Sequence, residues 1–324
     1  MTRALRRRPP AARRRNFSAV LVFLAAIAAL VLQFQPEPVG ADPDALSVRT
    51  QDLGGLLEQP VLDSGSDRDP TAENGTAAGH SPMDDRRALL LSILLLEKGH
   101  EHLRACGNYT ATVFTRERVK GVLLDPQVMM LKIRHQPLSL YLKWLIGDKG
   151  RELLYVQGQN NGNMIVKVGG IKGKLLPALK LAPTGNLALK EARHPVTEIG
   201  LLELARQLIE KRKRDLESDG GFRCEMLADR QVDGRPCYGF VQRFASPTDS
   251  PEYRKCVLLI DKQQCLPVYL QNFTWPETEP APDSQDELDQ ATLVEHYQYS
   301  DVQFEQRLAD VDFDRKNKAY NFRR

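Results

Sequence analysis

Histidine is the first residue type to examine for chemistry, because imidazole can ligate a metal ion or act as a general base. His100 and His102 are two positions apart near the end of an expected helix. Such positions project about 200° from each other, so the pair cannot ligate one metal ion from a regular helix. His135, His194 and His296 stand singly, with no Ser or Cys beside them in a nucleophile-elbow pattern. The histidines therefore predict neither a metal site nor a catalytic triad.

The cysteines offer a second possible chemistry, either as disulfides or as metal ligands. No pair has CxxC or zinc-finger spacing, so the pattern speaks against a metal site. Their odd number leaves at least one unpaired or paired to another chain, and their spacing assigns no partners. Small buried thiols in a β core are the alternative interpretation. The five are Cys106, Cys224, Cys237, Cys256 and Cys265.

A glycine-rich segment, residues 169–174 (GGIKGK), could cradle a phosphate with its backbone N–H groups. It lacks the Walker spacing, and neither Ser nor Thr follows Lys174. We therefore expect a loop there. With no catalytic constellation in the chain, we expect a protein that is not an enzyme and needs no cofactor.

Charged residues occur within one expected strand, at Arg116, Glu117 and Arg118. Strand alternation places the two arginines on one face and Glu117 on the other. A solvated sheet face with cross-strand ion pairs is one interpretation. The functional alternative places Arg116 and Arg118 at the mouth of a hollow, where they would meet a lipid head group or a carboxylate of a partner.

Long apolar and aromatic side chains are the natural lining of such a hollow. They serve equally well as ordinary core residues, and periodicity alone does not identify the inner face of a sheet. The candidate groove-lining residues are Met130, Leu140, Tyr141, Trp144, Tyr155, Tyr238, Phe240, Tyr269 and Phe273.

The elements that must position these residues are mostly strands. Apolar spacing predicts a helix from Asp84 to the residue before Gly107, and a second helix over 197–216. Asp233-Gly234 is a strong hairpin signal between two strands, and an acidic loop is expected over 276–290. No βαβ alternation occurs, so we expect an α+β fold with an antiparallel sheet of about ten strands. The expected strands are 109–116, 128–134, 138–145, 151–157, 164–168, 222–232, 236–244, 255–261, 266–275 and 291–300.

The N-terminus indicates export. Seven arginines precede the uncharged apolar run 17–34, a pattern that fits either a cleaved signal peptide or a membrane anchor within residues 1–41. Residues 42–83 are rich in Pro, Gly, Ser, Asp and Thr, and we expect a disordered linker. The folded domain would then be 84–324, in the periplasm or otherwise outside the cytoplasm. Without the N-terminal arginines the remainder is slightly acidic, which argues against nucleic acid as a partner.

Four segments carry a resemblance to known proteins: 107–121 (GNYTATVFTRERVKG), 137–162 (PLSLYLKWLIGDKGRELLYVQGQNNG), 266–276 (LPVYLQNFTWP) and 312–322 (DFDRKNKAYNF). The chain resembles a bacterial family of exported proteins, domain of unknown function 1571, over residues 84–322, and more distantly the LolA/LolB-like lipoprotein-carrier superfamily. The resemblance implies a curved antiparallel half-barrel with helices over its concave side. In the carriers that hollow holds lipoprotein acyl chains, whereas residues 169–221 here form an insert with no counterpart.

Two functions follow from this resemblance as expectations. The first is an extracytoplasmic, non-enzymatic protein that buries a lipid, a lipoprotein acyl chain or another apolar ligand in a half-barrel groove. The second is a membrane-tethered interaction or sensor domain of the cell envelope, which an uncleaved anchor at residues 17–34 would favour.

Overall fold

The computed structural model describes residues 82–218, 221–277, 284–304 and 307–322. All of them belong to one of the two compact units into which the chain divides, the unit that begins at Leu53. The predicted signal or anchor segment and the linker up to residue 81 lie outside the described residues. The first described helix begins at Pro82, two residues before the predicted domain boundary.

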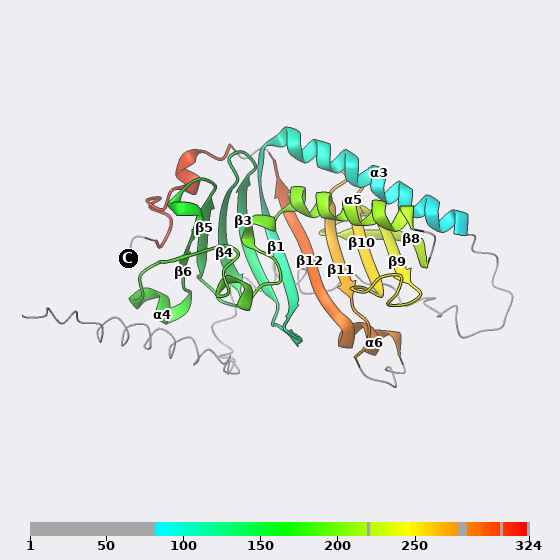
Figure 1. Ribbon diagram of the computed structural model, residues 1–324. Coiled ribbons are helices and arrows are strands. Elements are labelled where there is room, and N and C mark those ends of the chain that lie inside the picture. The colour runs from blue at the N-terminus through cyan, green and yellow to red at the C-terminus, as the bar shows by residue number, and fades with distance from the viewer. Residues whose placement is uncertain (1–81, 219–220, 278–283, 305–306, 323–324) are drawn as a thin grey trace, which may run out of the picture. The chain divides into compact units, whose positions relative to one another are not determined.

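Twelve strands form one open antiparallel sheet in the order β7-β6-β5-β4-β3-β1-β12-β11-β10-β9-β8, with the short β2 paired to β1 (Figure 1). The predicted α+β class, a curved antiparallel half-barrel beneath helices, is confirmed, and the strand number rises from ten to twelve. The two added strands, β2 and β7, are too short to show a period in the sequence. The strands are β1 Asn108–Val119, β2 Val122–Leu123, β3 Gln127–Arg134, β4 Ser139–Ile146, β5 Glu152–Val156, β6 Met164–Lys167, β7 Leu179–Leu181, β8 Phe222–Val232, β9 Arg235–Phe244, β10 Lys255–Asp261, β11 Pro267–Phe273 and β12 Leu293–Gln303.

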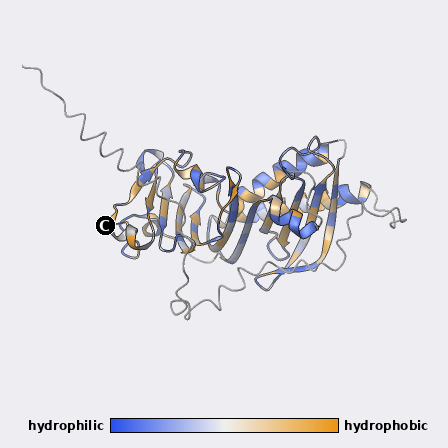
Figure 2. Ribbon diagram, turned by 90° about the horizontal axis from the view of Figure 1, so that it is seen from below, coloured by the Kyte–Doolittle hydropathy of each residue, from blue (hydrophilic) through white to orange (hydrophobic). Residues whose placement is uncertain are grey.

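The first and last long strands lie side by side in the middle of the sheet, where β1 pairs with β12. Each half of the sheet is then a meander of neighbours in sequence, so the chain needs few long connections. The β8–β9 hairpin turns at Asp233 and Gly234, whose φ angles of 52° and 70° match the predicted two-residue turn. Polar and apolar residues alternate along many of the strands (Figure 2), as expected when the two faces have different surroundings.

Two long helices pack over one face of the sheet (Figure 1). Helix α3 contacts α5 and the strands β8 and β9, and α5 also contacts β11. The Arg212 side chain of α5 is 1% exposed and donates a 3.0 Å hydrogen bond to Ser92 Oγ of α3. The helices are α3 Pro82–Cys106, α4 Gly170–Leu175, α5 Leu201–Glu217 and α6 Gln285–Thr292, with 3-10 turns η1 Asn160–Gly162, η2 Ala188–Lys190, η3 Val196–Glu198 and η4 Asp310–Phe313.

Two tyrosines from adjacent central strands fix the start of α5. The Tyr109 hydroxyl accepts a 2.6 Å hydrogen bond from the Leu201 backbone N–H, and Tyr299 accepts one of 3.2 Å from Gly200. These bonds satisfy N–H groups that have no partner within the helix. Gly200 has φ +109°, and a Cβ there would lie 2.8 Å from Ile133 Cδ1, so the helix starts four residues later than predicted because this turn requires glycine.

The C-terminal segment covers part of the other face of the sheet. Tyr320 stacks on Tyr141 of β4 with ring centroids 3.8 Å apart, and Phe313 and Phe322 belong to the same buried cluster. The basic, aromatic end of the chain is therefore part of the folded domain.

Two expectations about loops are wrong. Part of the acidic segment 276–290 is the helix α6, whose Ser284 Oγ caps it by accepting a hydrogen bond from Glu287 N at 3.2 Å. Most of the glycine-rich segment is the short helix α4, which begins at Gly170. Among the described residues, no helix combines the length and the apolar character needed to cross a bilayer.

Candidate ligand-binding cavity

A cavity of about 450 Å³ lies between the sheet and a roof made by α5 and the β7–α5 connection, residues 182–200. This volume is within the range of small-molecule sites, roughly 300–1,000 Å³. The connection and α5 both belong to the predicted insert 169–221. The insert therefore supplies the roof of the cavity.

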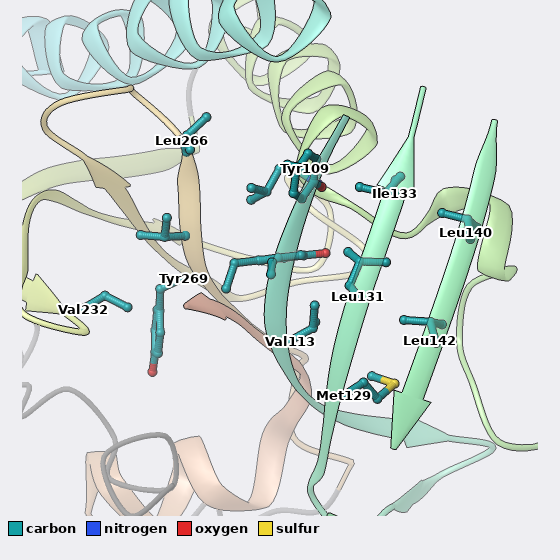
Figure 3. Close-up of a cluster of buried hydrophobic side chains, with 14 of the residues drawn as sticks. Tyr109, Val113, Met129, Leu131, Ile133, Leu140, Leu142, Val232, Leu266 and Tyr269 are labelled. Carbon is teal, nitrogen blue, oxygen red and sulfur yellow. The ribbon is translucent and has the colours of Figure 1, made fainter. Parts of the chain in front are cut away.

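One end of the cavity is apolar. Its floor consists of side chains from five strands that are consecutive in the sheet, β3 to β7. Figure 3 shows the side chains of Met129, Leu131 and Ile133 of β3 beside those of Leu140 and Leu142 of β4. The cavity-lining members of this floor are Met129, Leu142, Trp144, Leu153, Met164, Val166 and Leu181.

Trp144 holds a fixed position at this apolar end. Its Nε1 donates a 2.8 Å hydrogen bond to Gln127 Oε1, and the Arg151 guanidinium lies 5.2 Å from the ring centroid. With its polar atom paired, the indole presents an apolar surface to the cavity.

The other end of the cavity is polar and centres on Glu295 of β12. Its Oε1 accepts hydrogen bonds from Asn272 Nδ2 at 2.7 Å and from the Tyr253 hydroxyl at 3.0 Å. On the other side, Oε2 lies 3.1 Å from His194 Nε2 and 3.3 Å from Arg193 Nε, both of the β7–α5 connection. The connection is thus tied to the sheet through one buried carboxylate.

The pKa of Glu295 reflects these partners. Burial by itself would raise the pKa of this carboxyl, but hydrogen bonds from His194 and Asn272 and the charges of His194 and Arg193 hold it at about 2. The hydrogen bond to Glu295 raises the pKa of His194 above its ordinary value, against the opposing effect of burial. Both ionised forms are therefore stabilised by their proximity.

Glu117 of β1 forms a second anchor for the connection. Its Oε2 accepts a 2.9 Å hydrogen bond from the Arg193 backbone N–H, and its Oε1 accepts a hydrogen bond from the Tyr297 hydroxyl. His194 Nδ1 lies 3.5 Å from Glu198 Oε2 of the same connection. These contacts close the polar end of the cavity with protein groups that satisfy each other.

This chemistry suits binding. A carboxylate that already accepts hydrogen bonds on both oxygens has little capacity left to act as a base on a substrate. Among the described residues, no group of three His, Cys, Asp or Glu side chains is arranged to hold a metal ion. The hydrogen bonds instead set the shape of the cavity.

The five cysteines are free in the structure, and four of them are buried. Cys224 of β8 and Cys256 of β10 both lie opposite Gln242 of the intervening β9. Two strand spacings separate their Cα atoms by about 9.5 Å, which is beyond the reach of a disulfide. Burial raises the pKa of Cys224 to about 11, so this thiol stays protonated at neutral pH.

Of the nine predicted groove-lining residues, only Trp144 lies on the wall of this cavity. Leu140 and Tyr155 belong to the same core cluster as Trp144, and Phe240 packs in the cluster that includes α3 residues, with the partly buried Tyr238 against it. Met130 and Tyr141 pack against the C-terminal segment. Tyr269 contacts the His296 ring, and Phe273 lies below the charges of Arg254 and Lys255.

The predicted groove-mouth arginines do not line this cavity either. Glu117 lies on the cavity wall, so alternation places Arg116 and Arg118 on the opposite face of β1. Arg118 donates hydrogen bonds to the carbonyls of Leu293 at 2.9 Å and Ala291 at 2.8 Å, and Arg116 donates one to Leu124 O. In the structure Arg118 ties the end of α6 and the start of β12 to β1, and Arg116 ties the segment after β2 to β1.

Sequence reasoning missed Arg193, Glu117 and Glu295 as parts of a site and treated His194 as isolated. One signal was present: Glu295 shares its strand face with Tyr297 and Tyr299, so an acid interrupts an otherwise aromatic face. Nothing local in the sequence indicates that residues 193 and 194 lie against it.

The sequence profile described as protein of unknown function (DUF1571) matches residues 106–322. No curated protein matches the chain. Similar solved structures include a LolA superfamily protein from Nitrosomonas europaea, at 12% identity over 69% of this chain and 97% of that one, with a TM-score of 0.28. The lipoprotein LppX from Mycobacterium tuberculosis is similar at 11% identity over 68% and 99% of the two chains, with a TM-score of 0.38. At these TM-scores the superposition is loose, and the case for a function depends on the cavity.

Proposed function

The chain belongs to the DUF1571 family, and we propose that it is an extracytoplasmic, non-enzymatic binding protein that buries an amphipathic lipid or acyl chain beneath α5 and the β7–α5 connection. The acyl chain would lie over the β3–β7 floor. The polar group of the ligand would face β12 and α5.

The gradient of polarity along the cavity carries this proposal. The strand order places most of the apolar wall residues on β3 to β7, beside Gln127 and Arg151, and places Glu295 and Asn272 on β12 and β11. A ligand with one apolar and one polar part can satisfy both ends at once. A purely polar ligand would make no apolar contacts with the floor of the cavity. A purely apolar ligand would remove water from the charged groups at the polar end without replacing its hydrogen bonds.

The saturated hydrogen bonds of Glu295 support binding without catalysis. The apolar run 17–34 and the arginines before it support a location outside the cytoplasm. Residues 17–34 would serve either as a cleaved signal or as an anchor that keeps the domain near a membrane.

The test is ligand uptake by the protein purified from the cells that make it. We expect native mass spectrometry to find a lipid bound one to one, and a fluorescent fatty acid to bind the delipidated protein. Val166→Trp, on the apolar floor of the cavity, should reduce fatty-acid binding at least tenfold by filling the space. Leu94→Trp, at an exposed position of α3, is the matched control and should bind as the wild type does.

A protein that carries no lipid and binds no fatty acid would refute the proposal. Equal binding by Val166→Trp and wild type would place the ligand elsewhere. Either result would favour the alternative of a tethered interaction domain.

A further inference from the structure

Residues 153–190 differ in charge from the other described residues. They contain five lysines and no Asp or Glu, whereas 42 of the 324 residues of the chain are acidic. Lys180 and Lys190 are exposed, and Lys172 and Lys174 are in α4 itself. This segment is therefore a locally cationic part of a domain with mixed charge.

The same segment exposes large apolar side chains. Ile171 and Leu175 are 81% and 84% exposed, and as i and i+4 residues of α4 they lie on the same side of the helix. Leu179 and Leu187 are 44% and 48% exposed. We call Ile171, Leu175, Leu179 and Leu187, with Lys180 and Lys190, the α4 patch.

Glycines hold α4 close to the cavity. A Cβ on Gly169 would lie 2.7 Å from Lys149 O, and a Cβ on Gly173 would lie 1.9 Å from Val168 O. The Gly170 N–H donates a 3.1 Å hydrogen bond to Lys149 O. The start of α4 is thus seated on the β4–β5 turn, where position 169 has no room for a side chain, and Ile171 and Leu175 remain exposed.

That turn leads directly to the apolar end of the cavity. Trp144 and Arg151, which flank it and share a 3.0 Å backbone hydrogen bond, both line the cavity. Strand β6 before α4 and β7 after it contribute Val166 and Leu181 to the same wall, at the end of the sheet where Figure 1 shows α4. Leu187 both lines the cavity and is half exposed.

We propose that the α4 patch docks on the surface of an anionic lipid bilayer, with Ile171 and Leu175 inserted among the acyl chains and the lysines at the head groups. A segment that exposes apolar side chains and contains lysines but neither Asp nor Glu, as residues 153–190 do, has the composition that binds such an interface. The exposed leucines of α3 differ, because Asp84, Asp85 and Glu97 share that helix with its basic residues. The inference rests on the proposed function, since docking there would bring the apolar end of the cavity to the source of its ligand.

The test uses tryptophan as a depth reporter in the full chain. Leu175→Trp is compared with Leu94→Trp on α3, with the fluorescence of the wild type subtracted for Trp144 and Trp275. Vesicles of brominated phosphatidylcholine, with or without an equal part of phosphatidylglycerol, quench a tryptophan that enters the acyl region. Residues 17–34 are present in every variant, so any contribution from them is common to both reporters.

We expect the Trp at position 175 to be quenched by the anionic vesicles and not by phosphatidylcholine alone, while the Trp at position 94 is quenched by neither. Lys180→Glu/Lys190→Glu should lower the quenching of the reporter at position 175 by half or more, as should high salt. Equal quenching in both vesicle types, equal quenching of both reporters, or none would overturn the proposal. So would a blue shift at position 175 that grows with protein concentration without vesicles, because that result indicates a second copy on the patch.

The two proposals fail separately. Lys180→Glu/Lys190→Glu should bind a fluorescent fatty acid from solution as well as the wild type does. If the wild type takes up the fatty acid but does not dock on anionic vesicles, only the docking surface is refuted. Docking without any uptake would refute only the lipid-binding function.

Discussion

Replacement of Glu295 by glutamine removes the charge that holds Arg193 and His194 of the β7–α5 connection on the sheet. The side chain of Glu295 is 5% exposed, so solvent screens its interactions little. Its pKa of about 2 in the folded protein lies below the ordinary value of 4.5. We expect Glu295→Gln to fold but to lose stability at neutral pH.

The magnitude follows from linkage between protonation and folding. A difference of about 2.5 pKa units corresponds to about 3 kcal/mol of stability. Because the folded pKa is the lower one, this contribution is complete above pH 4.5 and is lost as the pH falls through 4.5 towards 2. Between pH 5 and pH 3 the loss attributable to Glu295 should be about 2 kcal/mol.

Urea unfolding of the wild type and Glu295→Gln across pH 5 to pH 3, followed by tryptophan fluorescence, measures this loss. Because other carboxyls titrate in both proteins, the difference between the two free energies of unfolding isolates Glu295. The difference should be about 3 kcal/mol at pH 6 and shrink as the pH falls. Glu252→Gln removes one negative charge from an exposed position on the cavity wall and serves as the control. A difference that stays constant from pH 5 to pH 3 would refute the electrostatic account of the connection.

Four further substitutions test the contacts around the cavity and the helices. The pKa of His194 in the folded protein is raised above its ordinary value of 6.5, so protonation of His194 stabilises the fold below pH 6.5. This contribution is lost as the pH rises through the pKa of the folded state. His194→Gln should therefore lower the thermal midpoint at pH 6 and leave it unchanged at pH 9. Tyr109→Phe leaves a buried backbone N–H of α5 without its acceptor and should cost about 1–3 kcal/mol in urea unfolding. Tyr269→Phe should cost nothing, since that buried hydroxyl has no hydrogen-bond partner among the described residues. Gly99→Ala, which in most helices stabilises, should destabilise here, because its Cβ would lie 2.0 Å from Cys265 O. An increase in unfolding midpoint for Gly99→Ala would show that α3 can move away from the β10–β11 turn.

The sequence by itself determined most of the elements. Each of the ten expected strands is present with its ends within three residues of the prediction, and the Asp233-Gly234 turn has the predicted conformation. Period-2 patterns and turn residues are local properties, so a single sequence contains them. The resemblance to the DUF1571 family, based on short motifs, is confirmed by the profile match.

Which face of each strand lines the cavity, and which residues pack against it, depended on the tertiary structure. Trp144 and Tyr141 are equally plausible lining residues by type, but they lie on opposite sides of one strand, and only packing against the C-terminal segment identifies the outer side. Because the sequence does not show which face of β1 lines the cavity, Arg116 and Arg118 were predicted at its mouth, whereas Glu117 lies on its wall. Alternation defines two faces and does not say which one is covered.

The candidate site depended on the tertiary structure still more strongly. His194 and Glu295 are 101 residues apart, and they meet because β12 lies between β1 and β11 while the β7–α5 connection crosses above it. Neither residue carries a local signal of the other, since the free energy that places them comes from strand order and helix packing across the whole sheet. The sequence thus determined that a sheet with two faces and two covering helices would form, and only the fold decided where its cavity lies and which charges close it.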